Sequence, residues 1–203
     1  EMDVRPEAGA ASRHEIKAAS LVCSGHFLSH FYYLSPLILL PAIKSTLEIS
    51  FTALGLALSG YGLIAGVMQV PVGFIVDRYG APAILVAGLT LSASAFILFG
   101  LAPSFATFGL SMLLFGLGDS VFHPADYSIL SKVTSPDTLG RVFSLHNFSG
   151  QFGFFAAPLL IGAMLPTIGW QGAFVVEGGV GIFVAVAIYV CRSLLSGQDG
   201  DAE

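Results

Sequence analysis

The chain has 203 residues, of which 55% are hydrophobic and only 10% are charged, whereas soluble domains carry about 25% charged residues. A water-soluble fold of this size cannot bury so much apolar surface, so the composition predicts an all-α membrane protein. The net charge of −5 says little about the interior, because acidic residues gather at both chain ends. No basic run suggests binding to nucleic acid.

Six stretches of the sequence are long and apolar enough to cross a membrane, which takes about 20 residues. We expect helices there, because lipid leaves backbone groups no partner outside the segment. The stretches run roughly over 18–43, 51–76, 82–102, 105–131, 141–166 and 170–191. The predicted six-helix domain covers 18–192, between polar tails at 1–17 and 193–203.

The basic residues orient this predicted bundle. With the N-terminus in the cytoplasm, seven basic residues lie inside, and only Lys44 lies outside, as the positive-inside rule favours. We therefore expect both termini to be cytoplasmic. The inside residues are Arg5, Arg13, Lys17, Arg78, Lys132, Arg141 and Arg192.

The loop after the second span has a patterned sequence, G-F-I-V-D-R-Y-G. Gly73 permits a close helix contact, and Gly80 permits a tight turn. Asp77 and Arg78 can bridge to charges or to a neighbouring helix end. A solvated loop charge pair is the alternative to these roles.

This loop resembles the G-x-L-x-D-R-x-G-R-[RK] motif of the major facilitator superfamily, with Ile75 in place of Leu. The resemblance implies a gating motif of Gly73, Asp77, Arg78 and Gly80. The closing basic pair is absent, because Ala81 and Pro82 occupy its positions. In the fifth span, Gly153, Pro158 and Gly162 resemble a degenerate Gly-Pro antiporter motif of that family, in which the proline can kink the helix.

Two further segments resemble fosmidomycin-resistance-type efflux carriers. They are S-V-F-H-P-A at 120–125 and the opening H-F-L-S-H-F-Y at 26–32. The resemblance implies one half of a twelve-span transporter in a bacterial cell membrane, with a second six-helix half as partner. That half would come from the same gene or from a second copy. The first residue, Glu1, and the polar tail from Ser193 favour a gene that continues.

Ionisable residues lie within two of the spans. His26 and His30 share one face of the first span, and Asp119, His123 and Asp126 share one face of the fourth. Each ionisable group inside a membrane costs about 2.5–3.5 kcal/mol on insertion scales, so these faces should meet protein or water. The resemblance implies that spans 1 and 4 both line the central cavity.

The two faces can be compared in depth by counting residues from the predicted cytoplasmic ends of their spans, at Lys17 and Lys132. His30 and Asp119 both lie about 20 Å from the inner end, and His26 and His123 about 14 Å. We hypothesise a proton-coupling cluster of these residues and Asp126, because histidine titrates near neutrality. A structural His–Asp pair and a divalent-metal site are the alternatives.

Other polar residues within the spans are candidates for lining the cavity. They are Gln69, His146, Asn147 and Gln151.

Taken together, the sequence predicts a secondary active transporter of a small molecule. We do not expect an enzyme, since no nucleophile with a base and no H-E-x-x-H pattern is present. Proton coupling and efflux are the expected mode, without a cofactor or a resident metal. The alternatives are a half-size membrane scaffold or sensor derived from a transporter, and a divalent-metal transporter.

Overall fold

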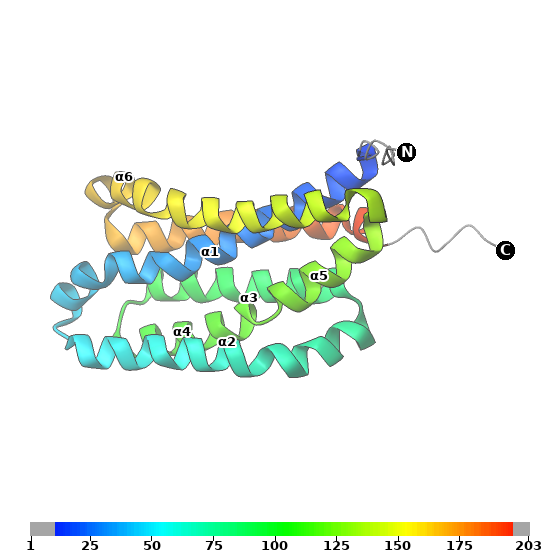
Figure 1. The fold of residues 1–203 in the computed structure, drawn as a ribbon. Coiled ribbons are helices and arrows are strands. Elements are labelled where there is room, and N and C mark those ends of the chain that lie inside the picture. Colours follow the sequence, from blue (N-terminus) through cyan, green and yellow to red (C-terminus); the bar gives the residue numbers. More distant parts are fainter. Residues whose placement is uncertain (1–10, 197–203) are drawn as a thin grey trace, which may run out of the picture.

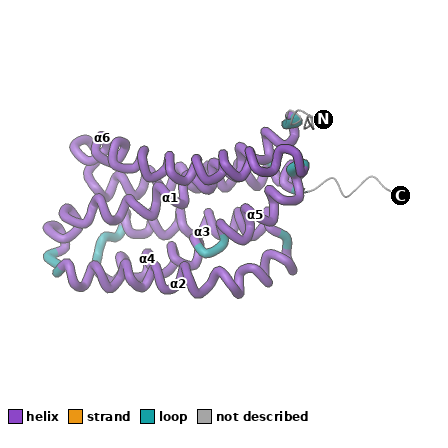
Figure 2. The backbone as a smooth tube through the Cα atoms, viewed as in Figure 1, coloured by secondary structure: helices purple, strands orange, loops and turns teal. Residues whose placement is uncertain are grey.

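The computed structural model describes residues 11–196, and every regular element in that part of the chain is helical (Figures 1 and 2). The elements are α1 (Arg13–Leu47), α2 (Phe51–Tyr79), α3 (Ala81–Leu101), α4 (Phe105–Asp119), α5 (Phe122–Val133), α6 (Pro136–Val190) and the short 3-10 helix η1 (Arg192–Leu195).

Within residues 11–196, five helical stretches are long and apolar enough to cross a membrane, with α4 and α5 together forming one of them. The longest, α6, has 55 residues and reverses direction at Gly169 (Figure 1). Gly169 has φ 68°, a value that glycine adopts at little cost. The reversal falls in the predicted breaker between the fifth and sixth spans, and it divides α6 into a first arm (136–168) and a second arm (170–190).

The predicted fourth span contains a break between α4 and α5. Ser120 and Val121 lie outside both helices. Pro124 has no backbone N–H, so it cannot bond to the carbonyl of Ser120 four residues earlier. The break separates Asp119 from His123 and lets the two halves of this stretch present their side chains in different directions.

A single residue, Gly80, joins α2 to α3. Its φ of 88° favours glycine, as the sequence predicts for this turn. Asp77 and Arg78 are exposed beside it. A Cβ added at Gly73 would meet open space among the described residues, so any close partner of Gly73 must come from elsewhere.

The helices pack around an aromatic core. α1 and α3 both pack against α6, while α4 packs between α2 and α3. Many large apolar side chains face outward instead, as expected for a surface that meets lipid or another protein surface. The fully buried rings include Tyr32, Phe96, Phe99, Phe108, Phe115 and Phe174.

Several glycines bring the backbones of neighbouring helices into direct contact, among them Gly118 and Gly153. A Cβ at Gly118 in α4 would lie 2.6 Å from the carbonyl oxygen of Gly88 in α3. A Cβ at Gly153 would clash with the carbonyl oxygen of Phe27 in α1. Gly153 therefore lets α1 and the first arm of α6 approach each other closely. This contact lies about one helical turn along α6 from the polar residues described next.

Candidate functional site

The polar residues of α1, α4, α5 and α6 meet in the middle of the bundle and form two adjoining groups. The first group surrounds Asp119. One carboxylate oxygen accepts a hydrogen bond from Ser29 Oγ at 2.5 Å, and the other accepts one from Tyr61 Oη at 2.8 Å. Hydroxyl donors on α1 and α2 thus hold a carboxylate at the end of α4, where an unpaired charge would be costly.

Asp119 opens onto a cavity of about 340 Å³. Both of its hydrogen-bond donors line the same cavity, so solvent or a bound molecule there can reach the carboxylate. The polar and titratable residues of its lining are Ser29, His30, Tyr33, Tyr61, Gln69, Asp119 and His123.

The second group is centred on Asp126 of α5. His146 Nε2, from the first arm of α6, lies 3.0 Å from Asp126 Oδ2, and His26 Nδ1, from α1, lies 3.5 Å from the same oxygen. The exposed fraction of all three residues is 2% or less. Asp126 Oδ1 has no hydrogen-bond partner, so this buried group is only partly satisfied.

Four imidazole rings surround this centre. The His26 ring stacks on His146 with a centroid distance of 3.7 Å and lies 4.5 Å from His30 and 5.5 Å from His123. Gly150 makes room for these rings, because a Cβ there would lie 2.8 Å from His26 Nε2 and from His30 Cε1. The buried ring nitrogens without a hydrogen-bond partner are Nδ1 of His26, His30, His123 and His146.

The structure brings the five residues of the proposed coupling cluster to one place, but it distributes them over the two groups. Asp119 belongs to the cavity group, with His30 and His123 in the same lining. Asp126 and His26 belong to the buried group. The two rings matched in depth along the sequence, His26 and His123, do lie side by side.

The candidate cavity residues separate in the same way. Gln69 lines the cavity. His146 is fully buried beside Asp126. Asn147 and Gln151 are exposed on the first arm of α6. No sequence pattern points to Ser29 and Tyr61, which are 90 and 58 residues away from Asp119 along the chain.

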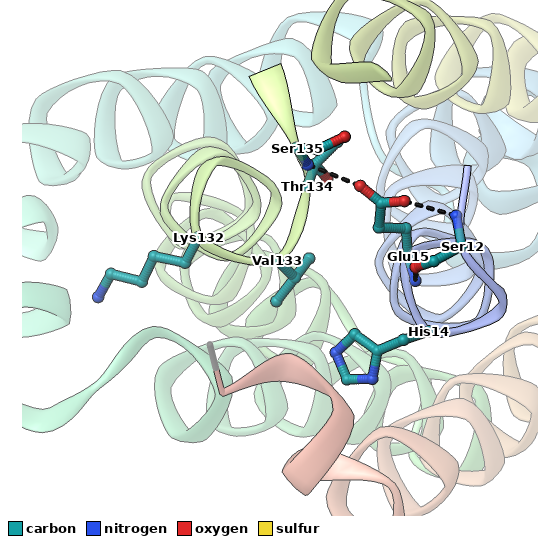
Figure 3. Close-up of a pocket in the computed structure, with 7 residues that line it drawn as sticks. All are labelled: Ser12, His14, Glu15, Lys132, Val133, Thr134 and Ser135. Carbon is teal, nitrogen blue, oxygen red and sulfur yellow. Dashed lines mark hydrogen bonds between the residues drawn. The ribbon is translucent and has the colours of Figure 1, made fainter. Parts of the chain in front are cut away.

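A third polar contact lies at the end of the bundle where α1 begins, between Glu15 and the segment that joins α5 to α6 (Figure 3). Glu15 accepts hydrogen bonds from the backbone N–H of Ser12 and of Ser135, each at 2.6 Å, and from Thr138 Oγ1 at 3.0 Å. Figure 3 shows Lys132 pointing away from this carboxylate. The backbone N–H of Ser135, followed by that of Ser12, lowers the pKa of Glu15 to about 2.

A further buried acid lies on the second arm of α6. Ser35 Oγ lies 2.9 Å and 2.7 Å from the two oxygens of Glu177. Tyr32 Oη donates to the backbone carbonyl of the same residue at 2.7 Å. These contacts tie α1 to α6 and are separate from the cavity.

A helical bundle with apolar stretches of membrane-spanning length and charged groups held in its centre defines a multi-pass integral membrane protein. The sequence of residues 22–200 matches the family model of the Major Facilitator Superfamily. The chain therefore belongs to this superfamily of transporters, as its motifs predict, and it does not belong to an enzyme family.

The chain is similar to two proteins of Escherichia coli (strain K12). It is 28% identical over 189 residues to the fosmidomycin resistance protein, covering 91% of this chain and 45% of that protein. It is 28% identical over 148 residues to the probable L-galactonate transporter, covering 73% of this chain and 33% of that protein. The resemblance to fosmidomycin-resistance-type carriers is thus confirmed.

The fold is similar to that of a bacterial homolog of the human lysosomal transporter Spinster, in its inward-facing and occupied conformation. The TM-score is 0.79 at 18% sequence identity, over 89% of this chain and 45% of that one. The chain spans less than half the length of each of these relatives.

Proposed function

We propose that the protein is a secondary active transporter of a small molecule that is coupled to protons, with Asp119 as the coupling carboxylate. The observation that carries the proposal is the position of Asp119, which lines the cavity and is held there by Ser29 and Tyr61. A carboxylate at such a place can exchange a proton with the cavity, and its protonation removes a charge from the middle of the membrane.

The groups that face Asp119 come from three helices. α1 contributes Ser29 and His30, α2 contributes Tyr61, and α5 contributes His123. Each of them can rearrange when the carboxylate gains or loses its proton. Protonation would thereby change the contacts between α1, α2 and α5, and these are the contacts that a switch between cavity states would use.

The architecture that we propose has six spans and both termini in the cytoplasm. The reversal at Gly169 supports the sixth pass, since it lets each arm of α6 cross the membrane once. The positive-inside bias supports the orientation. The wide outward-facing apolar surface and the matched lengths of the relatives support a second six-helix half, which would complete the substrate site.

Two motifs keep their proposed roles in this architecture. Asp77, Arg78 and the turn at Gly80 are exposed at one end of the bundle, where they can contact a second half and act with Gly73 as a gate. The Gly-Pro segment of Gly153, Pro158 and Gly162 lies on the first arm of α6, whose Gly153 packs closely on α1.

Efflux is the proposed direction, since the name of one relative refers to drug resistance. The other relative is named for a sugar acid, so fosmidomycin and L-galactonate are both suitable first probes. We place the transporter in a bacterial cell membrane.

The test uses the whole transporter in proteoliposomes, with a pH gradient and the two probe substrates. We expect Asp119→Asn and His30→Ala to abolish accumulation driven by the gradient, whereas exchange of labelled for unlabelled substrate without a gradient persists. Glu177→Gln is the matched control, because it removes a buried carboxylate that lies outside the cavity. Accumulation at the wild-type rate in Asp119→Asn would rule out the proposed coupling role.

A further inference from the structure

The buried group of His26, Asp126 and His146 has the composition and the spacing of a metal site. Its three ligand atoms, two imidazole nitrogens and one carboxylate oxygen, all lie within 4.8 Å of one another. We propose that these residues bind a divalent transition-metal ion, for which zinc serves as the probe. This proposal goes beyond transport and does not depend on which substrate is carried.

The measured distances suit such an ion. Zinc bound tetrahedrally at about 2.0–2.1 Å keeps neighbouring ligand atoms roughly 3.3–3.4 Å apart. The distances from Asp126 Oδ2 are 3.0 Å to His146 Nε2 and 3.5 Å to His26 Nδ1, one on each side of this value. A bound ion would lie between Asp126 Oδ2 and the two ring nitrogens, and the stacked rings of His26 and His146 would turn so that both nitrogens face it.

The donor set selects the class of ion. Two imidazoles with one carboxylate suit zinc and the neighbouring transition metals, whereas calcium and magnesium prefer ligand sets made entirely of oxygen. Three protein ligands leave a fourth position for water or for another side chain. The rings of His30 and His123 lie beside His26, and each has an unpartnered Nδ1.

The surroundings of the group provide a route for the ion and balance its charge. His30 and His123 line the cavity and also contact His26, so they connect the cavity to the buried ligands. Two carboxylates, Asp119 and Asp126, lie within this polar region and can offset the charge of a divalent ion.

The three ligands lie on three different elements, α1, α5 and the first arm of α6. A bound ion would cross-link these elements and hold their relative positions. The ligands do not line the cavity, so the ion is a resident of the bundle rather than a molecule carried through it. We expect zinc to slow any motion in which α1 and α6 separate.

The proposal is tested on the purified full-length chain in detergent, with zinc ions alone as the ligand. Titration calorimetry and elemental analysis should find one zinc per chain. X-ray absorption at the zinc edge should show two imidazole ligands with oxygen and no sulfur. A zinc environment that contains sulfur, from Cys23 or Cys191, would overturn the assignment without any mutation.

Variants identify the ligands. His146→Gln and Asp126→Asn should each lower the zinc affinity by at least about tenfold, since even an outer partner of a ligand is worth 10–100-fold. His14→Gln is the control outside the cluster, and it should keep one zinc per chain.

Two further results would overturn the proposal. One is the absence of stoichiometric zinc from the wild-type chain, and the other is zinc binding that is unchanged in folded His146→Gln. Fluorescence of the single tryptophan, Trp170, shows whether each variant is folded. If the ligand variants do not fold, the X-ray absorption spectrum of the wild-type chain still decides the question.

Discussion

Two carboxylates connect α1 to later helices, and their surroundings differ. Glu15 lies on α1 and contacts the start of α6, whereas Asp126 lies on α5 and contacts α1. At the end of the bundle, Glu15 is held by three donors, two of which are backbone N–H groups. In the middle, Asp126 contacts two imidazoles through a single oxygen, and its other oxygen has no partner. Both carboxylates are buried, yet only the first is satisfied.

This difference indicates different roles. A buried carboxylate with good donors on both oxygens stabilises the fold, because the donors replace the water that it loses. A buried carboxylate with a free oxygen, surrounded by unpartnered ring nitrogens, costs free energy. Glu15 is therefore a structural clamp, and the group of Asp126 is shaped for a ligand or a function.

The largest effect on stability should come from removing the clamp. Glu15→Ala leaves the N–H groups of Ser12 and Ser135 without their acceptor, and we expect a loss on the order of 3 kcal/mol, since hydrogen bonds to charged groups contribute about 1.5–3 kcal/mol each. The apparent Tm in detergent, followed by the fluorescence of Trp170, measures the loss. The control is Glu48→Ala, because Glu48 is exposed; equal losses in both variants would contradict a clamp.

A somewhat smaller loss should follow from crowding the imidazole rings. Gly150→Ala places a Cβ 2.8 Å from the His26 and His30 rings, and we expect a loss of about 1–3 kcal/mol, as for other overpacked cores. Gly62→Ala is the matched control, because a Cβ there meets open space. An unchanged Tm in Gly150→Ala would show that the His26 and His30 rings can move aside. The packing around Gly150 would then not fix the positions of these rings.

The sequence was sufficient for much of this arrangement. The i, i+4 and i+7 spacing predicts one shared face for Asp119, His123 and Asp126; the break between α4 and α5 divides that face, but Asp119 and Asp126 still both contact α1. The breaker before Trp170 locates the reversal at Gly169.

The sequence indicates His146 only as a cavity candidate, and Glu15 only as one of the acidic residues near the N-terminal end. Their partners lie 20 and 120 residues away along the chain. Such pairs depend on how the helices pack against one another, and the spacing of residues within one helix cannot predict that.

Acid should weaken the clamp in a defined range of pH. The pKa of Glu15 is lowered to about 2 from its usual value of 4.5. The stability that it contributes is therefore complete above about 4.5 and is lost as the pH falls towards 2, with roughly half or more gone at about pH 3. The Tm difference between the wild-type chain and Glu15→Gln should shrink accordingly from pH 6 to pH 3. A constant difference would place the stabilisation in contacts that do not depend on the charge.

The smallest change in stability should come from neutralising the central carboxylate. Asp126→Asn keeps the shape of the side chain, removes a charge that the fold satisfies only in part, and leaves an amide oxygen that can still accept a hydrogen bond from an imidazole N–H. We expect the free energy of unfolding to change by less than about 1 kcal/mol, measured by the same Trp170 fluorescence at neutral pH without added metal. If Asp126→Asn instead loses as much stability as Glu15→Ala, the central group is a second clamp. A loss of that size would mean that the charge of Asp126 stabilises the fold. If stability is kept and zinc binding is lost, the group is retained for what it binds and not for what it holds together.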